Sequence, residues 1–184
     1  MARVSFQFGS APVTISALGS VQAIAASHEA AESIRASLSR FYDQAFADPS
    51  TWTGGVPSSA WDLFSPSVRS QAQRDAASLA LGRQVSGLAH LFVTQNSLFV
   101  RVLVDPRGRI EVSAADVRFA ASGELGDGRF VDILDRASFL FRPESGRWMI
   151  AGYPTASLTL VPVQPAPTPS SAASPSPSAS GGTP

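Results

Sequence analysis

The sequence has no cysteine, and this absence excludes several kinds of chemistry. Disulfide bonds, thiolate nucleophiles and cysteine-based zinc or iron–sulfur sites cannot form without it. Lysine is absent as well, so all fourteen basic residues are arginine, and fourteen acidic residues balance them. No basic stripe stands out along the chain, which argues against a nucleic-acid partner. The two histidines, His28 and His90, lie far apart in the sequence, and we therefore predict no metal site. Neither Gly54-Gly55 nor Gly181-Gly182 belongs to a phosphate-binding loop, and no cofactor is predicted.

A long apolar run is also missing. The stretch Val13–Ser27 follows Arg3 and ends in small residues, which is the outline of a signal peptide. Polar residues interrupt this stretch, and it is too polar to span a bilayer, which takes about twenty mostly apolar residues. Residues 1–27 are therefore predicted to be an N-terminal arm or a weak signal-like segment. Association with a membrane has no clear transmembrane segment to support it.

The chain does contain enough apolar material for one core, since 44% of its 184 residues are hydrophobic. Helical periodicity marks the N-terminal third. A first helix is predicted to begin at Ser27, which can cap it, and to end before Pro49. A short helix beginning at Ser59 and a third helix over Pro66–Leu79 are predicted to follow. The apolar face of the first helix consists of Ile34, Leu38, Phe41, Tyr42, Ala45 and Phe46.

From residue 84 onwards the apolar period changes to two, which is typical of strands. Five strands are predicted, over residues 88–94, 98–104, 111–122, 130–142 and 147–153. The first two are expected to form a hairpin that turns at Gln95–Ser97, and Ser157–Val161 is a possible extension of the last strand beyond Pro154. Helices followed by a meander indicate an α+β fold, with the N-terminal helices packed on one face of an antiparallel sheet. Residues 162–184 carry seven prolines and no charge, and are predicted to be a disordered tail.

Two stretches carry a resemblance to a known family. One is Phe41-Tyr42, late in the first helix, and the other is the closing hairpin Arg136–Ile150, whose turn reads Gly146-Arg147-Trp148. Over about residues 28–161 the chain resembles the nuclear transport factor 2-like superfamily, and within it the envelope-associated accessory proteins of high-GC bacteria. The resemblance implies a cone-like domain in which a curved sheet wraps the helices, and it favours a cell-envelope or extracellular location. Those proteins usually begin with a clear transmembrane helix, and this sequence shows none.

A charge on a face that should be apolar is a candidate for binding or catalysis. Asp135 lies among the apolar residues that share one face of the fourth predicted strand. A carboxylate held there would have a raised pKa and could act as a general base. The alternatives are a local bulge or an ion pair with Arg101, which interrupts the second predicted strand.

Three further residues are predicted to line a ligand-binding pocket together with Asp135. His90 alternates with Leu88 and Phe92, so it is expected to point inward, although a lone histidine is more often structural. Tyr42 and Trp61 could also line the pocket, although aromatic residues at such spacing more often belong to the core.

The sequence thus favours a non-catalytic accessory or binding domain that holds a small apolar ligand or a protein partner. The alternative is a small lyase or isomerase, in which Asp135 is the base and His90 or Tyr42 assists. The two hypotheses differ in whether Asp135 and His90 converge in an open cavity. A homodimer that uses the outer face of the sheet is a third possibility, and it requires an exposed apolar patch.

Overall fold

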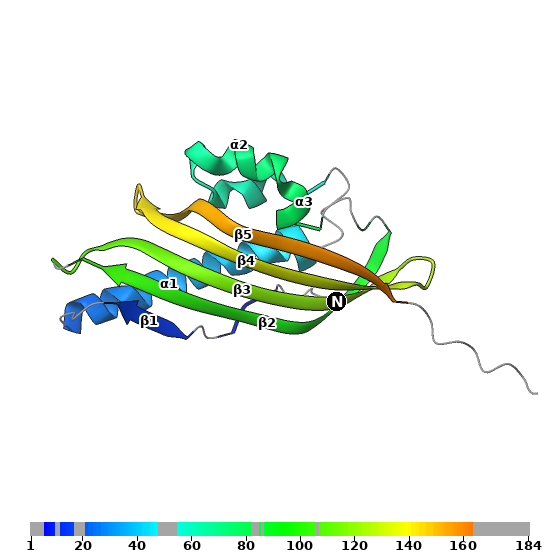
Figure 1. Ribbon diagram of the computed structural model, residues 1–184, viewed down its shortest axis with the longest axis horizontal. Helices are drawn as coiled ribbons and strands as arrows, with labels where there is room; N and C mark the ends of the chain where they lie inside the picture. The colour runs from blue at the N-terminus through cyan, green and yellow to red at the C-terminus, as the bar shows by residue number, and fades with distance from the viewer. Residues whose placement is uncertain are drawn as a thin grey trace, which may run out of the picture.

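The computed structural model of the chain describes residues 6–9, 12–16, 21–47, 55–81, 85, 87–105 and 107–163. It has an α+β fold, as predicted, in which the long N-terminal helix packs on one face of a five-stranded sheet (Figure 1). The predicted disordered tail lies outside the described residues from residue 164 onwards. The elements in chain order are β1 (Val13–Ser16), α1 (Val21–Tyr42), the π-helix η1 (Asp43–Ala47), the 3-10 helix η3 (Ser58–Leu63), α2 (Pro66–Arg74), α3 (Ala76–Leu79), β2 (Leu88–Val104), β3 (Ile110–Leu125), β4 (Phe130–Glu144) and β5 (Arg147–Val163).

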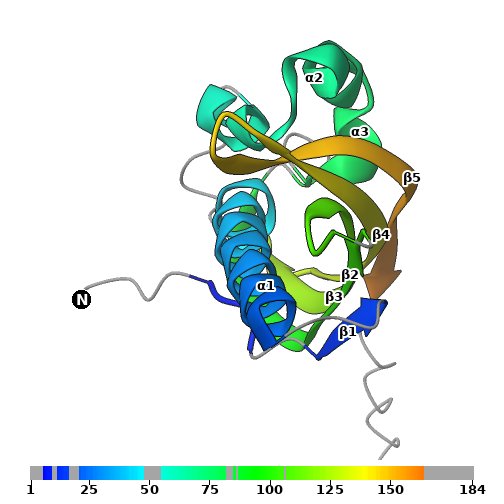
Figure 2. The ribbon, with the colours of Figure 1, turned by 90° about the vertical axis from the view of Figure 1, so that its left-hand side faces the viewer.

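The sheet is a meander of four long strands with a short strand at one edge. The strands lie in the order β1-β2-β3-β4-β5, and β2 to β5 pair antiparallel. The short strand β1 pairs parallel with β2, with Val13 opposite Val100, and this strand was not predicted. The sheet is therefore mixed. Figure 2 shows that it curls around α1, which lies on the concave side.

The predicted hairpin at Gln95–Ser97 is wrong, because β2 runs without a turn from Leu88 to Val104. The three polar residues stay in the ladder with β3, where Asn96 lies opposite Phe119. Their side chains are exposed, so a strand can carry them without cost to the core. Next to these residues the ladder has a register shift between Val93 and Gln95, and the strand continues through it. Three consecutive polar residues are typical of a turn, but in an exposed part of a strand they are equally compatible with the ladder.

The predicted extension of the last strand is confirmed, because β5 continues from Arg147 to Val163 through Pro154. Proline has no N–H to give to a ladder, so it is tolerated mainly in edge strands. In the described sheet β5 is the last strand of the order, so no further strand pairs with its outer side, where Phe64 forms an isolated bridge to Ile150.

The first helix begins six residues earlier than Ser27, at Val21. Ser27 is therefore no cap: it is buried within α1, and its hydroxyl donates to the carbonyl of Ala23 at 2.7 Å. The signal-like stretch Val13–Ser27 contains β1 and the first turns of α1. Among the described residues, no helix combines the length and apolar character needed to cross a membrane.

The core is an aromatic cluster between α1 and the sheet. The predicted apolar face of α1 is buried throughout. The π-helix η1 carries Phe46 around to stack on Tyr42, with ring centroids 4.7 Å apart. Phe8, from the N-terminal arm, also packs on Tyr42 at 5.1 Å, and its backbone N–H donates to Ser39. The arm thus closes one side of the core.

The short helices lie along the β5 edge of the sheet (Figure 1). Ser65 precedes α2 and Pro66 takes the first helical position, as predicted, whereas the residues from Ser59 form a 3-10 helix that follows Pro57. The backbone N–H of Ser65 donates to the carbonyl of Ile150 at 2.9 Å, which joins this segment to β5. The segment predicted as one helix over Pro66–Leu79 is divided at Asp75 into α2 and α3.

Candidate functional site

Asp135 points into the core, as the alternation of β4 predicted. The side chain is only 2% exposed, between Ile133 and Ala137 on the inner face. Its partner is Tyr42 of α1, whose hydroxyl donates to a carboxylate oxygen of Asp135 at 2.5 Å. The predicted alternative, an ion pair with Arg101, is wrong, because Arg101 lies on the opposite face of the sheet and is exposed.

The surroundings of this pair change the acidity of both groups. Burial raises the pKa of the Asp135 carboxyl to about 7, and the hydrogen bond from Tyr42 lowers it only in part. Burial, and then the nearby carboxylate, raise the pKa of Tyr42 well above its ordinary value. The carboxyl group of Asp135 therefore exchanges its proton near neutral pH, while the tyrosine keeps its own.

The pair is enclosed by other side chains. Phe119 and Leu158 lie opposite Asp135 on the neighbouring strands, and Phe46 stacks on the Tyr42 ring. The described residues form pockets at the surface, and neither Asp135 nor Tyr42 lines either of the two described below. A general base must come within hydrogen-bond reach of the proton that it abstracts. In this conformation a substrate has no such access to Asp135.

His90 does not join the pair, and its predicted inward orientation is wrong. It is exposed near the start of β2, opposite Glu124, and its ring lies 6.5 Å from that of Phe92. A register shift between Leu88 and His90 breaks the alternation, so Leu88 is buried while His90 is not. Asp135 and His90 therefore do not converge.

Trp61 lies in the core and not at a pocket wall. It is 5% exposed and packs against Phe41 and Phe64, with ring centroids 6.1 and 5.7 Å away. Of the four residues predicted to share a pocket, the structure brings together only Tyr42 and Asp135, and it does so inside the packed core.

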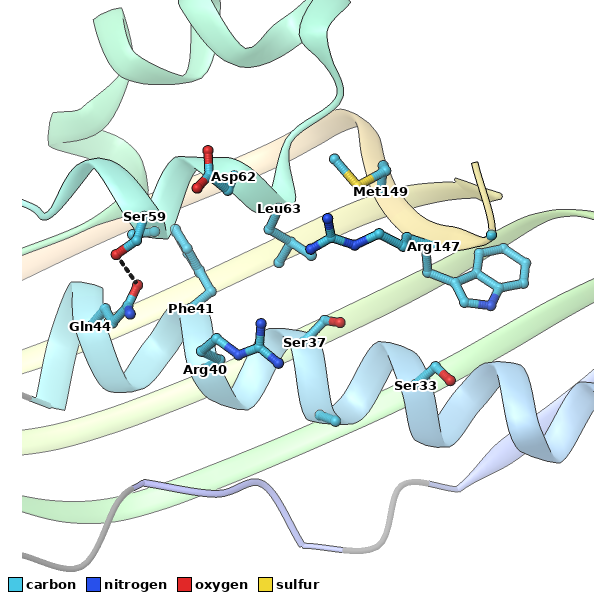
Figure 3. A pocket seen from close by; sticks show the side chains of 14 residues that line it. Ser33, Ser37, Arg40, Phe41, Gln44, Ser59, Asp62, Leu63, Arg147 and Met149 are labelled. Atoms are coloured by element: carbon cyan, nitrogen blue, oxygen red, sulfur yellow. Dashed lines mark hydrogen bonds between the residues drawn. The ribbon is translucent and has the colours of Figure 1, made fainter. Parts of the chain in front are cut away.

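A surface cleft of about 320 Å³ lies between α1, η3 and the turn that joins β4 to β5 (Figure 3). We call it the arginine cleft, because Arg40 of α1 and Arg147 of β5 extend their guanidinium groups into it from opposite walls. Phe41, Leu63 and Met149 supply apolar surface. Its polar side chains are those of Ser33, Ser37, Gln44, Ser59 and Asp62.

Local sequence fixes the backbone positions of both arginines. Arg40 lies in the last turn of α1, on the exposed side opposite the apolar face. The β4–β5 turn is tight, since Ser145 and Gly146 both have positive φ angles of 50° and 76°, which suits a two-residue hairpin loop. Arg147 follows at once, so its backbone is held at the rim of the cleft.

The arginine cleft has a positive charge that the described residues do not neutralise. Its acidic residue, Asp62, lies 3.3 Å from the guanidinium of Arg69, outside the cleft lining. No described carboxylate lies within ion-pair distance of Arg40 or Arg147. Guanidinium groups stay charged at any physiological pH and bind carboxylates and phosphates through paired N–H donors. The cleft is thus suited to an anion with an apolar part.

Sequence reasoning missed this cleft. In the sequence, Arg147 stands out only as part of the closing hairpin, and nothing marks Arg40 as a binding residue. Comparison of the chain with protein-family models, with curated proteins and with solved structures found no match.

Proposed function

We propose that the protein is a non-catalytic binding domain that holds a small amphipathic anion in the arginine cleft. The observation that carries this proposal is the convergence of Arg40 and Arg147, from separate elements, in one cleft with no carboxylate to pair with either among the described residues. The ligand class is a molecule with a carboxylate or phosphate group and an apolar body. The anionic group lies between the two guanidinium groups, and the apolar body lies on Phe41, Leu63 and Met149.

The chemistry of the cleft supports binding over catalysis. Arginine does not exchange protons near neutral pH, so Arg40 and Arg147 serve as anchors and not as acid or base. Asp135, whose pKa burial raises to about 7, lies in the core and outside the cleft lining. A small apolar ligand held inside the cone has less support, because aromatic side chains fill the space beside Tyr42.

The alternative function is that of a small lyase or isomerase with Asp135 as its base. The raised pKa of Asp135 favours this alternative, since a base near pH 7 is well matched to proton transfer. It requires the aromatic packing around Tyr42 to open. We also propose, from the resemblance, a place in the nuclear transport factor 2-like superfamily. The curling of the sheet around α1 supports that proposal.

Calorimetric titration with octanoate and octyl phosphate tests the binding proposal. We expect both anions to bind saturably and octanol, which has the same apolar chain and no charge, to bind at least 10-fold more weakly. Replacement of Arg40 or Arg147 by glutamine is expected to weaken anion binding by roughly 10-fold each, because hydrogen bonds to charged groups contribute on the order of 1.5–3 kcal/mol.

The matched control is Arg107→Gln, which removes the same charge from the exposed β2–β3 turn. This variant should bind like the wild type. Equal affinities of wild type and Arg40→Gln/Arg147→Gln for octyl phosphate would refute the proposal. So would equal affinities for octanol and octanoate.

A further inference from the structure

The outer face of the sheet, which points away from α1, carries large exposed apolar side chains. Figure 1 shows this face towards the viewer, with α1 behind the strands. Leu134 is 48% exposed at its centre, and Phe130 is 43% exposed nearer one end of β4. Other exposed apolar residues of the face are Phe99, Leu103, Leu140 and Val161. An apolar patch of this kind on a soluble domain usually marks an interaction surface.

Charged residues flank Leu134 with opposite signs. Successive outward residues of β4 are Asp132, Leu134 and Arg136, so the order is negative, apolar, positive. Two copies can pack face to face, with their β4 strands antiparallel, about a twofold axis that lies between the copies at Leu134. The two Leu134 side chains then contact each other. Each Arg136 then faces Asp132 of the other copy. A self-complementary pattern of this kind is what a twofold symmetric interface requires.

The neighbouring strand adds a second unpaired positive charge. Arg118 of β3 lies directly opposite Arg136 of β4, an arrangement of like charges that destabilises a sheet. Asp116 is the nearest acidic residue on β3, but it already accepts from Arg101 at 2.8 Å and from Ser138 at 2.5 Å. No described carboxylate pairs with Arg118 or Arg136.

In the twofold arrangement both of these arginines approach one acceptor. Asp132 lies at the matching position on the other side of Leu134, and it accepts from Ser122 at 2.6 Å, which orients its carboxylate. Asp132 of the second copy therefore comes opposite the Arg118–Arg136 pair. Two guanidinium groups that repel each other in the single chain then share a carboxylate.

The shape of the face agrees with the same arrangement. A groove of about 460 Å³ crosses the outer face, and Phe99, Asp116, Arg118 and Ser138 are among its lining residues. Ser138 is four residues beyond Leu134 along β4, and Phe130 is four residues before it. The twofold axis therefore places Phe130 of the second copy over Ser138. The small side chain of Ser138 leaves space there for the phenylalanine ring. Each copy offers one groove and one phenylalanine.

We infer that the protein forms a homodimer through the outer face of its sheet, about a twofold axis that crosses β4 at Leu134. The sheets pack face to face, with an apolar centre and two symmetric clusters of Arg118, Arg136 and Asp132. The arginine cleft lies on α1 and the β4–β5 turn, outside this interface, so both copies keep it accessible.

Sedimentation velocity of the full chain over a range of concentrations tests the inference by charge exchange. The wild type is expected to be a dimer. In Arg136→Asp, the new carboxylate faces Asp132 of the other copy at both clusters, and the two acidic groups repel. In Asp132→Arg, each cluster contains only arginines. Each variant is expected to dissociate at least 100-fold more readily than the wild type. The control Arg107→Asp, on the β2–β3 turn, should remain dimeric.

Recovery of the dimer distinguishes this interface from a general loss of folding. An equimolar mixture of Arg136→Asp and Asp132→Arg should form a heterodimer, because opposite charges again meet at both clusters. Circular dichroism of each variant shows whether it is folded. A wild type that stays monomeric, single variants that stay dimeric, or folded variants that fail to associate when mixed would each overturn the inference.

Discussion

Replacement of Tyr42 by phenylalanine is expected to lower the free energy of unfolding at pH 8 by about 3 kcal/mol, because it leaves a buried carboxylate without its donor. The hydroxyl of Tyr42 donates to Asp135 at 2.5 Å inside the core. The substitution keeps the aromatic ring that stacks on Phe46, so packing changes little. Urea unfolding of wild type and variant, followed by circular dichroism, measures the difference.

The loss of unfolding free energy in Tyr42→Phe should depend on pH, whereas a loss caused by poorer packing would not. At pH 5 the Asp135 carboxyl is protonated in the folded state and needs the donor less, so the cost of Tyr42→Phe should shrink. Tyr153→Phe is the matched control, since it removes a hydroxyl that donates to Asp75 at 2.9 Å near the surface. We expect a smaller loss for it. A cost for Tyr42→Phe that is the same at pH 5 and pH 8 would contradict the role given to Asp135.

The second large effect concerns the pH dependence of stability. Burial raises the pKa of Asp135 to about 7 in the folded state, from its ordinary value of 3.8. Below about pH 4 both folded and unfolded chains hold the proton. Between pH 4 and pH 7 the unfolded chain has lost it while the folded chain keeps it, so this group's contribution to stability falls as the pH rises. The whole contribution is roughly 4 kcal/mol, and it is lost above about pH 7.

Asp135→Asn isolates this contribution, because asparagine stays neutral and can still accept from Tyr42. We expect the variant to be more stable than the wild type at pH 8 and the difference to shrink towards pH 4. Acids in the turns, such as Asp105 and Asp127, whose pKa values hydrogen bonds lower, affect both proteins equally and cancel in the difference. A constant difference between wild type and variant over this range would contradict the raised pKa.

Much of the fold could be predicted from periodicity, because the buried residues of α1 and β4 follow simple spacing. The inward orientation of Asp135 is an example, since β4 alternates without interruption around it. The tight turn at Gly146 is another. In both places local sequence and tertiary packing require the same conformation.

The errors arose where the local pattern was ambiguous or interrupted. Gln95–Ser97 resembles a turn, yet it continues β2, because exposed polar side chains are compatible with a strand. His90 points outward because of a register shift, and the residue types around it do not predict such a shift. The start of α1 at Val21 was hidden within a segment that resembled a signal peptide.

The arginine cleft could not be found from the sequence at all. Arg40 and Arg147 are more than a hundred residues apart, and each on its own is an ordinary exposed arginine. Only the packing of the β4–β5 turn beside α1 and η3 brings them to one cleft. The same is true of Arg118 and Arg136, whose opposition depends on the register of β3 with β4.

We propose that this domain binds its ligand at the surface, in the arginine cleft, and not inside the curled sheet. Backbone amide chemical shifts of the full chain, followed by NMR during titration with octyl phosphate, test it most directly. We expect the shifts to change at Arg40, Arg147 and Trp148, and to stay constant at Asp135 and Phe119. Changes that are largest at Asp135 and Phe119, with none around the cleft, would show that the ligand enters the interior and would contradict the claim.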